Sequence, residues 1–316
     1  MSPLLRRLGP LLGLVATYLL FALLAGASFT SWANLELMLL QTAVVGTAAV
    51  GATWIIVAGG IDLSVGSTIA LGTMVGALVL RAGGTPLDAA LAAVAAGAAA
   101  GALIGVLVTG TLLRLPLSPF VVTLGLWGAL RGLAKGLGDN QPVYPGSTGW
   151  LAALMVSGEG FLGLAWGVWV LLGVAGLAAL ALRHTVFGRH AVAIGSSEET
   201  ARLCGVRVAR TKLGVYVLGA GCAGVAAVLQ LSYLSMGDPT PAQGYELKCI
   251  AAAVIGGASL AGGEGSIAGT LVGALLMTVV DNGCTKLGLD NWVQEVVTGA
   301  IIVAAVALDR VRQREG

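Results

Sequence analysis

Residues 8–27 read LGPLLGLVATYLLFALLAGA, an uninterrupted apolar run of 20 residues that follows Arg6 and Arg7. Because a helix rises about 1.5 Å per residue, about 20 apolar residues are needed to cross the roughly 30 Å hydrocarbon core of a bilayer. A secretory signal has an apolar core of only about 7–15 residues. The run therefore predicts a first membrane span and not a signal that is removed.

The composition of the whole chain agrees with this span. Of the 316 residues, 57% are hydrophobic and 10% are charged, against about 25% charged residues in an ordinary soluble domain. A water-facing surface cannot be covered with so few charges, so lipid is the expected solvent. Aromatic residues make up 5%, which disfavours a β-barrel with aromatic girdles. The sequence predicts an all-α, polytopic membrane protein that forms a single transmembrane domain over residues 1–316.

Charged, Pro-rich and Gly-rich breaks divide the chain into about ten predicted transmembrane helices, with a count of eight to eleven left open. They comprise residues 8–28, 36–58, 63–80, 88–112, 116–136, 160–182, 212–235, 246–261, 266–283 and 291–308. The eighth, 246–261, is shorter than a straight crossing requires. We expect this segment to be tilted, broken or re-entrant.

The distribution of basic residues predicts the orientation. With ten spans, 12 of the 17 lysines and arginines fall on one side of the membrane. Cytoplasmic loops carry these residues in excess. Both termini and the long loop 183–211 are therefore expected in the cytoplasm, and the segment 137–159 is expected outside. Arg131 and Lys135, near an end of the fifth span, are expected to extend to water.

Two segments of the chain resemble each other. Residues 66–78 and 265–275 share a Gly-Ser start and a Val-Gly-Ala-Leu end, and each follows a Gly-Gly pair, at 59–60 and 256–257. Duplicated helical units are common in transporters. An internal duplication and a chance likeness of two Gly/Ala-rich helices both remain open interpretations.

Several classes of partner and chemistry are disfavoured. The net charge is +2 and no basic tract alternates with aromatic residues, so nucleic acid is not an expected partner. The Gly-x-x-x-x-Gly-Lys-Ser/Thr phosphate loop is missing, so the chain is not expected to be an enzyme or to hold ATP as a cofactor. The cysteines are widely spaced and only two histidines could join them, so neither disulfides nor a metal site is expected. These residues are Cys204, Cys222, Cys249, Cys284, His184 and His190.

The loop 183–211 contains a helix-start signature. Ser196 can accept a hydrogen bond from the third helical N–H while Glu199 bonds back to the N–H of Ser196, which together would form a capping box. Gly195 and Gly205 then bracket a helix of about two turns.

Glu198 and Arg202 are spaced to pair on the exposed face of this helix. A short, well-bounded helix in the main cytoplasmic loop suits docking by a soluble partner. A linker helix that only tolerates water is an equally open interpretation of these residues.

A second informative stretch joins the second and third spans at residues 59–67. Asp62 is placed to cap the third span by accepting from backbone N–H groups near Ser64 and Val65. The alternative is a broken helix start that lines a solute path.

Three motifs in order along the chain resemble the membrane permeases of ribose/xylose/galactose-type ABC importers. They are GGIDLSVGS at 59–67, AIGSSEETARLCGV at 193–206, and GYEL at 244–247 leading to AVIGGASLAGGEGS at 253–266. The likeness covers nearly the whole chain. It implies a second permease subunit, identical or different, a cytoplasmic ATPase subunit that binds ATP and Mg, and an extracytoplasmic sugar-binding protein.

The resemblance also implies roles for particular residues. The candidates for coupling to the ATPase are Gly195, Ser196, Ser197, Glu198, Glu199, Ala201, Arg202 and Gly205. The candidates for the translocation path or a helix break are Gly59, Gly60, Asp62, Ser64 and Glu246. Two departures from the family, at Ser197 and Cys204, leave the docking assignment in place but identify no particular sugar.

The predicted function is that of a permease subunit that moves a monosaccharide or similar small polar solute inward by alternating access. A branched-chain amino acid or nucleoside permease is the related alternative, which the 59–67 motif disfavours. An ion-coupled secondary transporter is disfavoured because the predicted spans carry few charges at mid-depth. An intramembrane hydrolase is disfavoured because both histidines lie in the loop 183–211.

Overall fold

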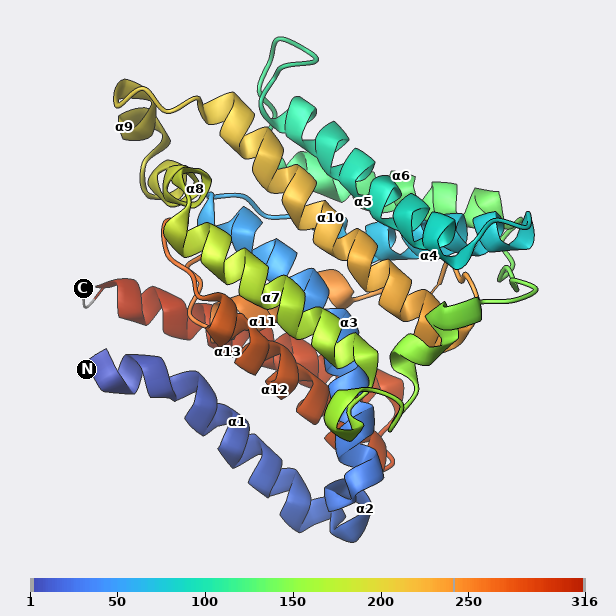
Figure 1. The fold of residues 1–316 in the computed structure, drawn as a ribbon. Helices are drawn as coiled ribbons and strands as arrows, with labels where there is room; N and C mark the ends of the chain where they lie inside the picture. Colours follow the sequence, from blue (N-terminus) through green and yellow to red (C-terminus); the bar gives the residue numbers. More distant parts are fainter. Residues whose placement is uncertain (1–2, 241, 315–316) are drawn as a thin grey trace.

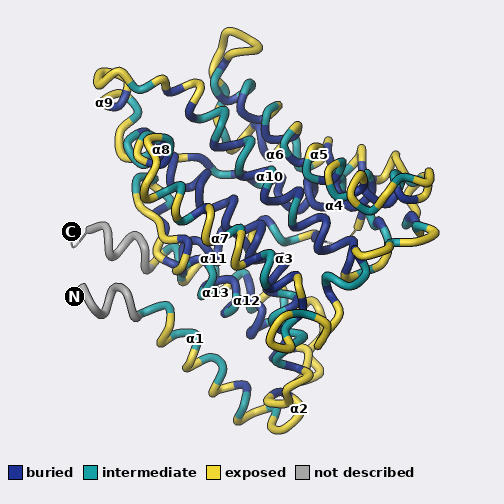
Figure 2. Tube along the Cα trace, viewed as in Figure 1, coloured by how far each residue is buried: buried dark blue, intermediate teal, exposed yellow. Residues whose placement is uncertain are grey.

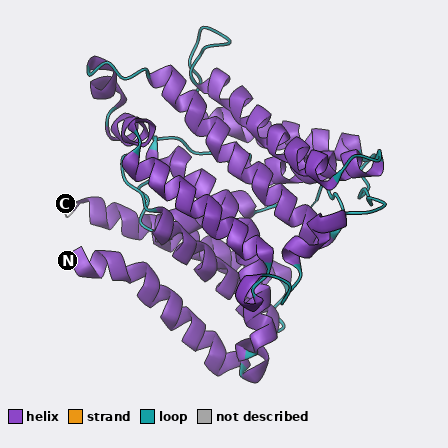
Figure 3. Cartoon of the chain, viewed as in Figure 1, coloured by secondary structure: helices purple, strands orange, loops and turns teal. Residues whose placement is uncertain are grey.

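The computed structural model describes residues 3–240 and 242–314, and within them the backbone forms helices and no β-strand, apart from one isolated bridge between Val143 and Gly237 (Figure 3). The helices before the long loop are α1 (Pro3–Ala25), α2 (Ala27–Thr30), α3 (Trp32–Val57), α4 (Val65–Arg81), α5 (Pro86–Val108), α6 (Pro119–Leu137) and α7 (Trp166–His184). Those that follow are α8 (Val186–Ser196), α9 (Glu198–Leu203), α10 (Val208–Leu234), α11 (Tyr245–Ile255), α12 (Ile267–Lys286) and α13 (Asn291–Arg314). Short 3-10 turns at Gly149–Met155 and Phe161–Gly163 connect α6 to α7.

Each of the ten predicted spans overlaps one long or intermediate helix of the bundle. By length and composition, α3, α5, α6, α7, α10 and α12 can each cross a membrane, and three shorter apolar helical stretches lie in α1, α4 and α13. Helix α11 has 11 residues, which gives it a length of about 16 Å, half of the hydrocarbon core. The structure thus confirms the all-α polytopic fold and the prediction that 246–261 is not a straight crossing.

Figure 1 shows that α1 begins and α13 ends at the same end of the bundle as α8 and α9. The predicted topology, with both termini on the side of the loop 183–211, agrees with this arrangement. The similar segments 66–78 and 265–275 form the first turns of α4 and α12. A duplication relating them stays a prediction.

Helix α3 is the centre of the fold. In its most apolar window 94% of the residues are buried, because α7, α10, α11 and α12 pack around it. From residue 42 to its end the helix is buried throughout, which Figure 2 draws in dark blue. The hydroxyls of Thr42, Thr47 and Thr53 each donate to the carbonyl four residues earlier in the same helix, and that of Thr53 also lies 2.7 Å from the hydroxyl of Thr270 in α12. A helix enclosed on every side needs no polar stripe, and α3 has none.

The outer helices expose apolar side chains instead. The examples with large exposed fractions come from α1, α5, α6, α7 and α13, and they are Leu23, Leu91, Leu133, Leu177 and Val303. Such an extensive exposed apolar surface would be unstable in water. It is the expected surface of a bundle whose solvent is lipid.

Glycines let α10 approach α3 and α5 to backbone contact. A Cβ atom built on Gly101 of α5 would lie 2.2 Å from the carbonyl oxygen of Tyr216, and one on Gly51 of α3 would lie 2.3 Å from that of Gly219. Small residues at such crossings allow the close van der Waals packing that holds helices together in lipid.

Replacing Gly101 with alanine is expected to lower the free energy of unfolding by about 1–3 kcal/mol, because the added methyl overpacks a contact made by backbone atoms. The matched control is Gly128→Ala in α6, where a Cβ meets nothing within 4 Å. Alanine there should be neutral or stabilising, since it favours the helix by up to about 1 kcal/mol. Heating the detergent-purified variants and measuring the monodisperse fraction tests this, and equal midpoints for the two variants would contradict it.

Candidate functional site

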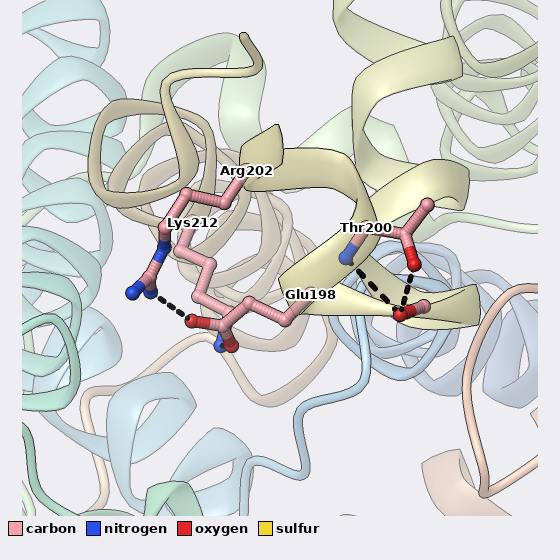
Figure 4. A network of polar contacts seen from close by, with 5 residues as sticks. Glu198, Thr200, Arg202 and Lys212 are labelled. Atoms are coloured by element: carbon pink, nitrogen blue, oxygen red, sulfur yellow. Dashed lines mark hydrogen bonds and ion pairs between the residues drawn. The ribbon is translucent and has the colours of Figure 1, made fainter. Parts of the chain in front are cut away.

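The loop 183–211 forms two helices, α8 and α9, separated by one extended residue. That residue is Ser197, with φ −163° and ψ 107°. Its Oγ accepts from the backbone N–H of Thr200 at 3.3 Å and donates to Thr200 Oγ1 at 2.9 Å (Figure 4). Ser197 is therefore the N-cap of α9.

The predicted capping box between Ser196 and Glu199 is not formed, and the N-cap lies one residue later, at Ser197. Ser196 is the last residue of α8, and its Oγ donates to the carbonyl of Val192 at 3.0 Å. An N-cap needs non-helical backbone angles, and a residue that closes a preceding helix does not have them. Gly195 likewise lies inside the last turn of α8 and does not precede a helix start.

The other features predicted for α9 are confirmed. The helix has six residues, and Gly205 follows its C-cap with φ +83°, a backbone angle that glycine adopts without strain. Arg202 Nη2 and Glu198 Oε1 are 2.8 Å apart. Ala201 is buried with Ile194 of α8 and Val208 of α10, so the helix packs on its neighbours through one small apolar face.

Glu198 also connects α9 to the long helix α10. Its Oε2 lies 2.5 Å from Nζ of Lys212, and Figure 4 shows both cations directed at this carboxylate. The hydrogen bond from Lys212 is the main cause that holds the pKa of Glu198 below its ordinary value. A lowered pKa means that the carboxylate is ionised throughout the neutral range, and the ion pair is lost only as pH falls through that lowered value.

Gly195 brings three distant segments into contact. A Cβ atom built on it would meet the carbonyl oxygen of Val57 at 1.9 Å and the backbone N of Gly263 at 2.5 Å. The N–H of Gly263 donates to the same Val57 carbonyl at 2.9 Å. Backbone contacts thus hold three segments together next to α9: the end of α3, the end of α8 and the loop after α11.

Gly59 and Gly60 lie at this same end of the bundle. Gly59 has φ +76°, and a Cβ on Gly60 would lie 2.5 Å from the hydroxyl oxygen of Tyr216. A small cavity is lined by both glycines together with Lys212 and Tyr216 of α10. The break after α3 is therefore adjacent to the residue that holds α9.

Asp62 and Ser64 lie deeper, where the chain enters α4. Asp62 is 3% exposed, and its Oδ1 accepts from the N–H of Ser64 at 2.7 Å and from the Ser64 hydroxyl at 2.6 Å. Acceptance from Ser64 was predicted, but α4 begins at Val65 with Ser64 as its N-cap residue. The aspartate closes a local turn ahead of the helix.

Glu246 lies in the first turn of α11 and is 8% exposed. Its Oε1 accepts from the indole N–H of Trp127 and from the N–H of Gly244, both at 3.2 Å. Its Oε2 lies against the backbone of Gly66, where a Cβ would be only 2.4 Å away. The structure thus brings Ser64, Asp62 and Glu246 to one place and leaves Gly59 and Gly60 at the coupling end.

Three contributors were missed by sequence reasoning. Lys212 carried one signal, as a basic residue at the junction between the loop and a span, whereas Trp127 and Tyr216 look like ordinary apolar residues of a membrane helix. Arg131 is partly exposed, as expected, and its Nη1 also donates to the carbonyl of Pro239 at 2.8 Å, while Lys135 is exposed. Among the described residues, no group of three or more His, Cys, Asp and Glu side chains could hold a metal ion.

Comparison with known proteins agrees with the three motifs and this architecture. The family described as "Branched-chain amino acid transport system / permease component" matches residues 34–306. The chain is 37% identical over 306 residues to the ribose import permease protein of Bacillus subtilis (strain 168), covering 96% of this chain and 93% of the relative.

Two further relatives extend this likeness. The ribose import permease protein of Escherichia coli (strain K12) is 39% identical over 309 residues, covering 95% of this chain and 93% of the relative. The L-arabinose ABC transporter permease protein of Azospirillum brasilense is 32% identical over 306 residues, covering 96% of this chain and 88% of the relative. No solved structure matches the chain. From its motifs, its helical architecture and these matches, the chain belongs to the family of branched-chain amino acid transport system permease components.

Proposed function

We propose that this chain is the permease subunit of an ATP-driven ABC importer that carries a monosaccharide or a similar small polar solute inward across the cytoplasmic membrane. The observation that supports this most directly is α9, a capped helix that protrudes from one end of a membrane bundle and is tied to α10 through Lys212. The relatives named for ribose and arabinose support a sugar as the solute.

In this proposal the loop containing α9 and both termini face the cytoplasm, where a separate ATPase subunit binds ATP and Mg. The segment 137–159 faces an extracytoplasmic sugar-binding protein. A second permease subunit, identical or different, completes the pathway.

Movement of the ATPase would reach the bundle through two connections. Glu198 transmits it to α10 through Lys212, and Gly195 transmits it to the end of α3. Because α10 packs along α3 and α5, displacement of α9 is expected to tilt the core helices of the bundle. This tilt would close the solute path on one side of the membrane and open it on the other.

Replacing Glu199 with lysine tests the docking role. Glu199 is exposed on α9 and, among the described residues, forms no ion pair, so reversing its charge alters the surface offered to the ATPase while leaving internal contacts in place. We expect weaker co-purification of the ATPase and at least a several-fold loss of ATP-dependent sugar uptake.

Glu295→Lys is the matched control, because it makes the same charge change at an exposed residue of α13. Normal ATPase binding together with unchanged uptake in Glu199→Lys would defeat the docking role. Uptake that persists without any ATPase and collapses with an ion gradient would instead identify a secondary transporter.

A further inference from the structure

Helices α4 and α11 begin against each other in the interior of the bundle. We call this place the helix junction and define it by Asp62, Ser64, Gly66, Trp127 and Glu246. Both helices exceed two turns, with 17 and 11 residues. The described residues before them, 58–64 ahead of α4 and 235–240 and 242–244 ahead of α11, are non-helical. Irregular backbone at membrane depth occurs where it is enclosed by protein or lines a solute path.

Each acidic side chain of the helix junction has one carboxylate oxygen without a hydrogen-bond partner. Oδ2 of Asp62 and Oε2 of Glu246 are both buried and unpartnered among the described residues. Their other oxygens are satisfied by Ser64 and by Trp127 with Gly244. A buried acceptor left without a donor destabilises the fold. Two such oxygens at one place point to a donor that is supplied from outside the chain.

The charge of the helix junction determines which donor fits. The first turns of α4 and α11 carry free N–H groups and the positive ends of two helix dipoles, an arrangement that normally attracts an anion. Here Asp62 and Glu246 already occupy those ends and lie within electrostatic range of each other, while the guanidinium of Arg131 acts on Glu246. Two acidic groups against this one basic group disfavour an incoming carboxylate. A neutral solute with several hydroxyl donors would meet unoccupied acceptors.

We propose that the unpartnered oxygens of Asp62 and Glu246 accept hydrogen bonds from hydroxyl groups of the transported sugar and thereby favour a polyhydroxyl solute over one bearing a carboxylate. This inference rests on the proposed function. Because both side chains are buried in the present conformation, the sugar reaches them when α4 and α11 separate during transport. The indole of Trp127, bonded to Glu246 Oε1 at 3.2 Å, fixes the orientation of that carboxylate.

The test is a cycle that pairs a carboxylate variant with a sugar lacking one hydroxyl. Complete importers carrying the unaltered chain, Glu246→Gln or Asp62→Asn are reconstituted with the ATPase and the binding protein. Uptake of ribose is compared with uptake of each monodeoxy ribose. For each chain, the uptake of ribose is divided by the uptake of the deoxy analogue. The ratio for a variant is then divided by the ratio for the unaltered chain. The preference of the binding protein, which is the same in every arm, cancels in this second division.

For at least one deoxy analogue, the preference for ribose should fall about tenfold in a variant, since a hydrogen bond to a charged acceptor contributes about that much. Glu295→Gln makes the same chemical change on the exposed face of α13 and should leave every ratio unaltered. Co-purification with the ATPase selects assembled complexes, and if one variant does not assemble, the other carries the same test.

Unaltered ratios for every analogue in an assembled variant would overturn the inference while leaving sugar import intact. Failure of the unaltered, assembled complex to import any pentose, hexose or other small polar solute in an ATP-dependent manner would instead overturn the proposed function. The two failures are thus distinguishable in one set of measurements.

Discussion

Replacing Gly195 with alanine is expected to reduce ATP-dependent uptake by roughly tenfold or more, although the change adds one methyl group. That methyl would lie 1.9 Å from the carbonyl oxygen of Val57 and 2.5 Å from the N of Gly263, both of which are backbone atoms that cannot rotate away. Overpacking of this kind costs about 1–3 kcal/mol, and about 1.4 kcal/mol corresponds to a tenfold change in an equilibrium.

The expected structural result is that α8 moves away from the end of α3, so that motion of α9 no longer reaches the core. Gly221→Ala is the control, because this glycine of α10 has nothing within 4 Å of an added Cβ. Uptake by reconstituted complexes, normalised to the amount of bound ATPase, separates loss of coupling from loss of assembly. Full uptake by Gly195→Ala would show that the contact with Val57 is not required.

Reversing the charge at Glu198 is expected to have the second large effect. Glu198 forms ion pairs with Arg202 and Lys212. A lysine at position 198 would repel both of these side chains. Each pair is partly exposed, with 41% of the Glu198 side chain accessible, so each contributes about 0.5 kcal/mol in water. Only the pair with Lys212 joins α9 to α10, so losing this attraction and gaining a repulsion weakens the attachment of α9 by about 1 kcal/mol, roughly a fivefold change in its attached population. The pair with Arg202 lies within α9, and its reversal destabilises the helix itself.

Exchange of the two charges provides the decisive comparison. The double variant Glu198→Lys, Lys212→Glu restores an ion pair between α9 and α10 with the two charges exchanged. The repulsion between Arg202 and the new lysine at position 198 remains. Uptake in the double variant should therefore recover in part relative to Glu198→Lys alone. No recovery, with normal assembly, would show that Lys212 does not connect α9 to the bundle.

The membrane spans could be predicted from the sequence because the hydrocarbon thickness sets a length that apolar runs must match. The same rule identified 246–261 as too short. It could not find α8, since residues 186–196 include Arg189 and His190 and form no apolar run. The cap of α9 was placed one residue early because Ser196 and Ser197 are both good N-caps, and the choice between them depends on where α8 ends.

The sequence predicted the two acidic residues of the helix junction but not that they lie close together. Asp62 and Glu246 were each selected as ionisable groups at a predicted helix start, but they belong to motifs far apart in the chain. Their proximity depends on how the non-helical segments before α4 and α11 pass through the bundle. Trp127, which bonds Glu246, gave no local signal because one indole in an apolar helix resembles any other packing residue.

The hydroxyls of α3 have a consequence for biosynthesis. This helix is synthesised before α5, α7, α10 and α12, so it must enter the bilayer before the helices that later enclose it exist. Because Thr42, Thr47 and Thr53 bond to carbonyls of their own helix, their donors need no neighbour, and we expect α3 to be tolerated by bare lipid until its partners are inserted.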